Sequence, residues 1–189
     1  MHNCGRRIVL ALVVVAMAFP FGASAFAQKP TGSKIDMPNF ADPAVLAKLP
    51  MLGRWKINIA KSNFNGSRAN SDTFTWIFEV EGDKIRHKIY DVYPSDKPNR
   101  TYAVKLNGTK SPDPHVPGIG ETVSWFPINR SMMFREVIRK GVAVEHVIYA
   151  VSADGKAFTS QSWQADNPDP KGISNLMYFD RQTGPAGSN

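Results

Sequence analysis

Short segments rich in β-branched and aromatic residues recur from Leu52 onward, and they constrain the fold more than any other feature of the chain. Gly, Asn, Asp and Pro separate these segments at intervals of roughly 10 to 15 residues, the spacing typical of strands joined by turns. We therefore expect an all-β domain. The predicted strands lie near residues 53–59, 72–80, 84–92, 100–106, 121–127, 132–139, 142–152, 156–164 and 173–181.

The turns predict how these strands pair. Gly82-Asp83 is typical of a two-residue hairpin loop, whereas the segments 139–141 and 153–155 each end in Gly and predict three-residue turns. Strands with short local connections form a meander, and closure removes the exposed edges that such a meander would leave. We expect an up-and-down antiparallel meander of about eight or nine strands, closed as a barrel; an open sandwich is the alternative.

The N-terminus has the pattern of a secretory leader. Arg6 and Arg7 precede an unbroken apolar run over residues 8–19, and small residues follow in Ala25-Phe26-Ala27. The run is shorter than the roughly 20 residues that span a bilayer. The sequence thus predicts a signal peptide over residues 1–27, a periplasmic or secreted destination, and no membrane-spanning segment after cleavage.

The remaining chain divides into three predicted parts. Residues 28–51 form a flexible lead-in with one short N-terminal helix, which Asp42 and Pro43 begin because Asp caps free amides and Pro suits the first turn. Residues 52–181 form the barrel domain, and 182–189 a flexible tail. The only cysteine is Cys4, so the mature domain folds without a disulfide. Its basic residues are scattered, which argues against nucleic acid as a partner.

Two stretches resemble a known family. Gly53-Arg54-Trp55 opens the first strand as Gly-x-Trp does in lipocalins and related calycin barrels. The longer opening over residues 53–64 and the Ser-x-Asp-Gly-Lys hairpin over 152–156 resemble bacterial exported lipocalin-like proteins of unknown role. The resemblance implies a lipocalin-like barrel in which Trp55 closes one end and Arg181 packs across it. A middle Thr-Asp-Tyr motif of typical lipocalins is missing.

Alternation along the strands and the predicted turns together indicate which side chains face the interior. They predict a mostly apolar interior in which a small polar set is embedded. The polar candidates for ligand binding are His87, Glu136, His146, Ser160, Ser162 and Asn175. The apolar candidates are Trp76, Phe78, Phe134 and Phe158.

Apolar walls with a few convergent polar groups describe a typical small-molecule pocket. The first hypothesis is therefore an exported barrel that binds a small, mostly hydrophobic ligand in its interior. A metal or haem site on His87 and His146, with Glu136 as a further ligand, is an alternative.

Two more functional hypotheses stay open. The first is a calycin-like enzyme that uses His146 and Glu136 near Ser160 or Ser162, although no nucleophile elbow, P-loop or dinucleotide motif occurs and no catalytic residue or cofactor is assigned. The second is an envelope interaction module without a ligand, in which exposed aromatic residues form the contact. The aromatic candidates for that contact are Trp125, Phe126 and Trp163.

Overall fold

The computed structural model describes residues 37–63, 72–113, 121–166 and 173–184. The predicted leader, residues 28–36 of the lead-in and residues 185–189 of the tail lie outside this part of the chain. None of the helices in it is long and apolar enough to cross a membrane.

The described chain forms one antiparallel sheet of ten strands, with the order β4-β3-β2-β1-β10-β9-β8-β7-β6-β5. In chain order the elements are α1 (Pro43–Leu46), β1 (Gly53–Ile57), a 3₁₀ helix (Ile59–Lys61), β2 (Thr75–Glu81), β3 (Lys84–Tyr90), β4 (Arg100–Val104), β5 (Ser111–Pro112), β6 (Glu121–Asn129), β7 (Met132–Arg139), β8 (Val142–Val151), β9 (Ala157–Gln164) and β10 (Ile173–Gln182).

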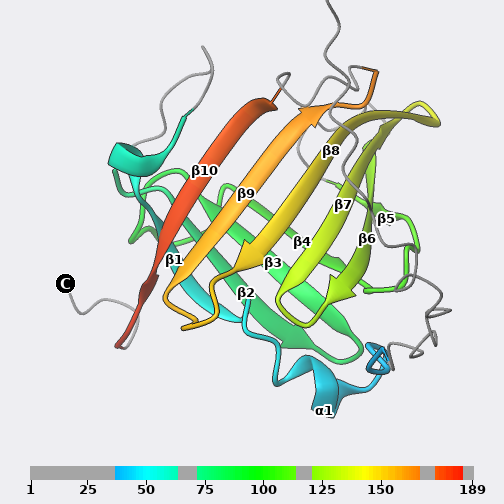
Figure 1. Ribbon diagram of the computed structural model, residues 1–189, viewed down its shortest axis with the longest axis horizontal. Helices are drawn as coiled ribbons and strands as arrows, with labels where there is room; N and C mark the ends of the chain where they lie inside the picture. Colours follow the sequence, from blue (N-terminus) through cyan, green and yellow to red (C-terminus); the bar gives the residue numbers. More distant parts are fainter. Residues whose placement is uncertain (1–36, 64–71, 114–120, 167–172, 185–189) are drawn as a thin grey trace, which may run out of the picture. The chain divides into compact units, whose positions relative to one another are not determined.

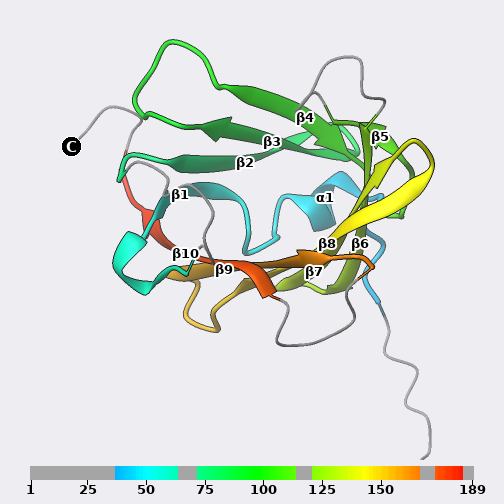
Figure 2. The same ribbon diagram turned by 90° about the horizontal axis from the view of Figure 1, so that it is seen from above.

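The sheet curls into a nearly closed antiparallel barrel, so the all-β meander is confirmed. Figures 1 and 2 show the curved sheet from two sides, with β2, β3 and β4 facing β8, β9 and β10. The first and last strands pair, and the edges β4 and β5 lie against each other. The number of strands is slightly higher than predicted because the two-residue strand β5 joins the sheet beside β6.

The short helix begins where the sequence predicts. The Asp42 carboxylate accepts a hydrogen bond from the Ala44 amide at 2.8 Å, and Pro43 occupies the first turn. Leu46, Leu49 and Met51 follow and are buried in the barrel core. The helix and the segment after it therefore belong to the packed domain.

The predicted strand pairing is wrong at two of the three predicted hairpin turns. The Gly82-Asp83 turn pairs Val80 with Ile85 as expected. The turn between β7 and β8, however, has only two residues, Lys140 and Gly141, with φ of 49° and 84°. Two positive φ angles match the twist of paired strands in a two-residue loop. The turn between β8 and β9 is one residue longer than predicted, with the Ser152 amide donating to the Ala157 carbonyl at 2.9 Å.

These turns decide which face of each strand is interior, because a shift of one residue moves a side chain to the opposite face. Alternate residues of β7 and β8 line or fill the interior: Met133, Arg135, Val137, Glu145, Val147 and Tyr149. The predicted interior residues Phe134, Glu136 and His146 occupy the other positions and face outward. Their predicted orientation is wrong.

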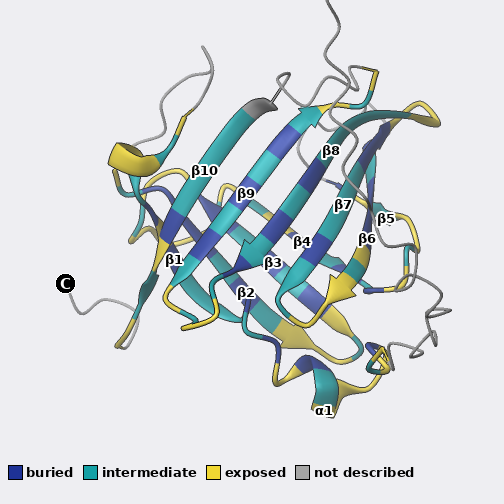
Figure 3. Ribbon diagram, in the orientation of Figure 1, coloured by how far each residue is buried: buried dark blue, intermediate teal, exposed yellow. Residues whose placement is uncertain are grey.

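Aromatic side chains pack the barrel near α1. The ring centroids of Trp55 and Phe158 lie 5.3 Å apart, and those of Phe78 and Phe158 lie 5.5 Å apart. Trp125 is fully buried beside Tyr149, with 5.0 Å between centroids. Figure 3 shows this burial as dark bands across the strands. Trp125, a candidate contact residue in the hypothesis of an interaction module, belongs to the core instead.

Arg181 closes this end of the barrel over Trp55. Its guanidinium carbon lies 4.1 Å from the Trp55 ring centroid, a cation–π contact. The same guanidinium donates hydrogen bonds to the carbonyls of Leu52 at 2.8 Å, Gly155 at 2.5 Å, and Pro50. Gly53 has a φ of 113°, and a Cβ there would lie 3.0 Å from the Arg181 guanidinium. The arrangement that the family resemblance implies for these residues is present.

We expect Arg181→Met to lower the free energy of unfolding by about 2–3 kcal/mol, because it removes the donors for three backbone carbonyls but keeps the chain length. Chemical denaturation measures the change. The exposed Lys56→Met on the adjacent strand is the control and should change stability by less than about 0.5 kcal/mol. Equal stabilities of the two variants would contradict the closing role of Arg181.

Candidate functional site: the barrel cavity

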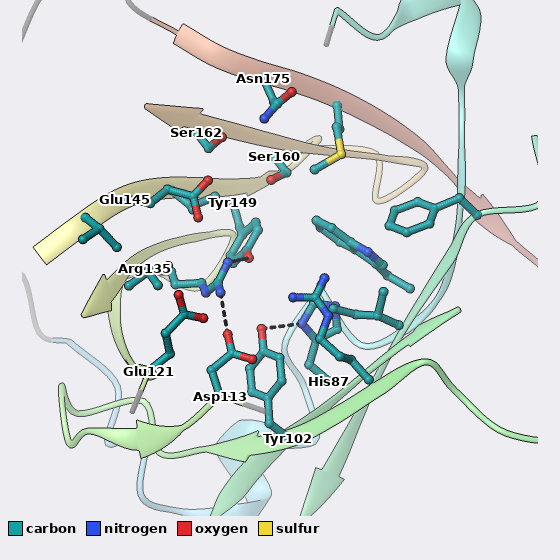
Figure 4. A pocket seen from close by; sticks show the side chains of 18 of the residues that line it. His87, Tyr102, Asp113, Glu121, Arg135, Glu145, Tyr149, Ser160, Ser162 and Asn175 are labelled. Carbon is teal, nitrogen blue, oxygen red and sulfur yellow. Dashed lines mark hydrogen bonds and ion pairs between the residues drawn. The ribbon is translucent and has the colours of Figure 1, made fainter. Parts of the chain in front are cut away.

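The half of the barrel away from Trp55 contains a cavity of ≈ 570 Å³. This volume lies within the range of about 300–1,000 Å³ typical of small-molecule pockets. One part of its wall is apolar, formed by Phe74, Trp76, Ile89, Val147 and Met177. Figure 4 shows the polar wall, where charged groups from β6, β7 and β8 face Tyr102 and His87, with Ser160, Ser162 and Asn175 beyond them.

His87 lies in the cavity wall with 1% of its surface exposed. Its ring stacks on Phe78, with 4.2 Å between centroids, and its Nδ1 is 2.9 Å from the Tyr102 hydroxyl. Burial, reinforced by the charges of Arg135 and Arg100, holds the pKa of His87 well below its usual value. His87 is therefore neutral at neutral pH.

Arg135 is the central charged group of the cavity. Its guanidinium donates to the Asp113 carboxylate at 2.9 Å and to the Tyr149 hydroxyl at 3.4 Å. The side chains of Arg135 and Asp113 are only 12% and 1% exposed. Burial opposes the charge of Arg135, but the neighbouring tyrosines and the carboxylates of Glu145 and Asp113 raise its pKa overall. The ion pair is thus held inside the barrel wall.

A second ion pair lies farther along β7. The Arg139 guanidinium donates to the buried Glu121 carboxylate, with 2.7 Å between Nε and Oε1. Glu145 also lines the cavity, on the strand next to Arg135. Burial raises the pKa of the Tyr102 and Tyr149 hydroxyls, so both phenols are neutral hydrogen-bonding groups. The polar wall therefore combines compensated charges with neutral donors and acceptors.

The predicted site residues divide into three groups. Trp76, His87, Ser160, Ser162 and Asn175 line the cavity, whereas Phe78 and Phe158 are buried beneath its floor. A separate cluster forms on the outer face, where the His146 ring lies 5.2 Å from that of Phe134 and 5.7 Å from that of Trp163. His146 Nε2 is 3.5 Å from Glu136 Oε1 in that cluster.

Five charged residues of the site were not predicted from the sequence: Arg135, Asp113, Glu121, Glu145 and Arg139. On β7 and β8, Arg135 and Glu145 alternate with residues of an opposite face that is also partly apolar, so hydrophobicity favours the wrong face. The spacing in β6 indicates which residues of its neighbour β7 face inward, because Val123 and Trp125 are two residues apart and share one face of the strand. Both are fully buried and pair with Val137 and Arg135.

The geometry does not assemble the metal or haem site proposed on two histidines. His87 lines the cavity and His146 lies on the outer face, so the two imidazoles cannot share a ligand. Among the described residues, no group of three or more His, Cys, Asp or Glu side chains could hold a metal ion. The proposed catalytic set fails for the same reason, because the sheet separates His146 and Glu136 from Ser160 and Ser162.

Comparisons with known proteins support the fold. No family model matches the chain, and no curated protein matches its sequence. Among solved structures, the Schistosoma mansoni fatty acid binding protein in complex with arachidonic acid is similar in fold, with a TM-score of 0.51 and 16% sequence identity. The match covers 71% of this chain and 97% of that protein. At this level of identity, the structural similarity shows a shared barrel fold alone.

The buried, neutral state of His87 predicts that stability depends on pH. Unfolded His87 binds a proton below about pH 6.5, whereas the folded pKa is well below that value. The unfolded state then holds more protons, so the His87 contribution to the unfolding free energy falls by about 1.4 kcal/mol per unit as the pH drops between the two values. Denaturation at about pH 7 and about pH 5 measures the dependence.

His87→Gln should remove this part of the pH dependence. The matched variant His146→Gln, on the outer face, should retain it because His87 is intact. An equal pH dependence in the wild type and His87→Gln would show that His87 is not responsible.

Proposed function

We propose that this protein binds a small, mostly hydrophobic molecule in its barrel cavity. The cavity itself carries the proposal: ≈ 570 Å³ of space inside a barrel whose other half is packed with aromatic rings. Apolar side chains such as Trp76, Ile89 and Met177 line the wall. Removing their surface and that of an apolar ligand from water lowers the free energy of the complex. The polar wall would orient one end of the ligand.

Unpartnered polar atoms around the cavity support the same proposal. Among the described residues, Trp76 Nε1, His87 Nε2 and Arg135 Nε are buried side-chain nitrogens with no hydrogen-bond partner. A buried polar group without a partner costs about 1–3 kcal/mol. All three residues line the cavity, and an uncompensated cost of this kind in a pocket wall is better explained by a binding role than by stability.

The fold comparison adds a precedent. The similar barrel from Schistosoma mansoni is a fatty acid binding protein, in complex with arachidonic acid. A protein with this fold can therefore bind a long apolar molecule, and we infer a ligand with a substantial apolar part for this chain as well. Which ligand it is depends on the groups of the polar wall.

We also propose that the protein is exported to the periplasm or secreted. The basic residues Arg6 and Arg7, the apolar run over 8–19 and the Ala25-Phe26-Ala27 site support this proposal. The function is then the binding or transport of a hydrophobic molecule outside the cytoplasm.

Filling the cavity should prevent binding. Ser162→Phe places a large ring on the cavity side of β9, whereas Gln161→Phe places the same ring on the other face of the strand. We expect saturable binding of the uncharged dye Nile red to the wild type, at least about tenfold weaker binding to Ser162→Phe, and unchanged binding to Gln161→Phe. Fluorescence titration measures all three.

Equal affinity of the two phenylalanine variants would place the dye outside the barrel and overturn the proposal. Far-ultraviolet circular dichroism checks that both variants retain the β-sheet.

The export proposal predicts the mature N-terminus. When the full chain is produced in a bacterium with a secretory pathway, mass spectrometry of the envelope fraction should find Gln28 as the first residue. Replacing Ala25 and Ala27 with bulky residues should leave the leader attached. Recovery of the intact, uncleaved wild-type chain from the cytoplasm would contradict export.

A further inference from the structure

We propose that the cavity selects a ligand with an uncharged polar end, such as a long-chain alcohol or amide, against the corresponding carboxylate. This inference rests on the proposed function, since it requires that the cavity binds an amphiphile. The balance of charges in the polar wall decides which head group of the ligand the cavity accepts.

The described lining residues already contain more negative than positive charge. Four carboxylates and three guanidinium groups line the cavity, for a formal sum of 3 − 4 = −1, with His87 neutral. These groups are Asp91, Asp113, Glu121, Glu145, Arg100, Arg135 and Arg139. A ligand carboxylate would add a second net negative charge to a partly desolvated space, where like charges repel more strongly than in water.

Arg135, the buried cation at the centre of this wall, is already compensated. It contacts Asp113 at 2.9 Å, and Figure 4 shows it between Asp113 and Glu145. A carboxylate that took the place of Asp113 on Arg135 would leave the Asp113 carboxylate, which is 1% exposed, without the guanidinium that balances its charge. Separating a buried ion pair in this way is strongly unfavourable.

An uncharged oxygen avoids both costs. A hydroxyl or amide carbonyl can accept a hydrogen bond from a neutral or charged donor without breaking the ion pair. The wall offers such donors and acceptors in Tyr102, Tyr149, Ser160, Ser162 and Asn175. Specificity would thus come from repulsion of the wrong head group as much as from attraction of the right one.

The test compares decanamide and decanol with decanoate, which share a chain length, by competition against Nile red at neutral pH. Any apolar cavity prefers a neutral amphiphile to some extent, so the informative quantity is the ratio of affinities for decanamide and decanoate in each variant. We expect the wild type to favour decanamide at least about tenfold. Asp113→Asn and Glu145→Gln should each lower that ratio about tenfold, because Arg135 then has charge to offer a carboxylate.

Glu136→Gln is the matched control, since Glu136 is next to Arg135 in sequence but faces outward. Its ratio should equal that of the wild type. A ratio unchanged in both Asp113→Asn and Glu145→Gln, or tighter binding of decanoate than decanamide to the wild type, would overturn the inference. Failure of all three probes to displace Nile red would instead count against the proposed function. If Asp113→Asn does not fold, Glu145→Gln alone decides.

Discussion

The contact between Trp55 and Arg181 is the interaction on which the rest of the barrel depends. Trp55 lies opposite Trp76 on β2 and opposite Arg181 on β10, so it sits where three paired strands meet. The same contact joins the first strand along the chain, β1, to the last, β10. With this end plugged by Trp55 and the aromatic rings around Phe158, the opposite half of the barrel keeps its space.

The two halves of the barrel interior differ in what occupies them. In one half, aromatic rings fill the space and contribute through burial and ring packing. In the other half, ion pairs such as Arg135–Asp113 and polar contacts such as His87–Tyr102 occupy the wall, and a cavity remains between them. Neither the Arg135–Asp113 nor the Arg139–Glu121 ion pair replaces apolar packing as a source of stability. We attribute their arrangement to the proposed recognition of a ligand.

The fold was predictable because strand spacing, turn residues and the Gly53-Arg54-Trp55 opening all indicate a closed meander. The site was only partly predictable. Strands β2, β3 and β9 were oriented correctly, which placed His87, Ser160 and Ser162 in the cavity wall. Strands β7 and β8 carry apolar residues on both faces, and Arg135 and Glu145 point inward, so hydrophobic alternation favours the opposite face. The turn at Lys140 was also assigned one residue too long.

The central claim is that the half of the barrel lined by Trp76 and Arg135 is a binding cavity. The most direct measurement is the position of a bromine atom in crystals of the protein grown with terminally brominated decanol, located by anomalous scattering. The account predicts a bromine peak inside the barrel, among Trp76, Tyr149 and Met177. A bromine peak only on the outer face, beside Phe134 and His146, would contradict it.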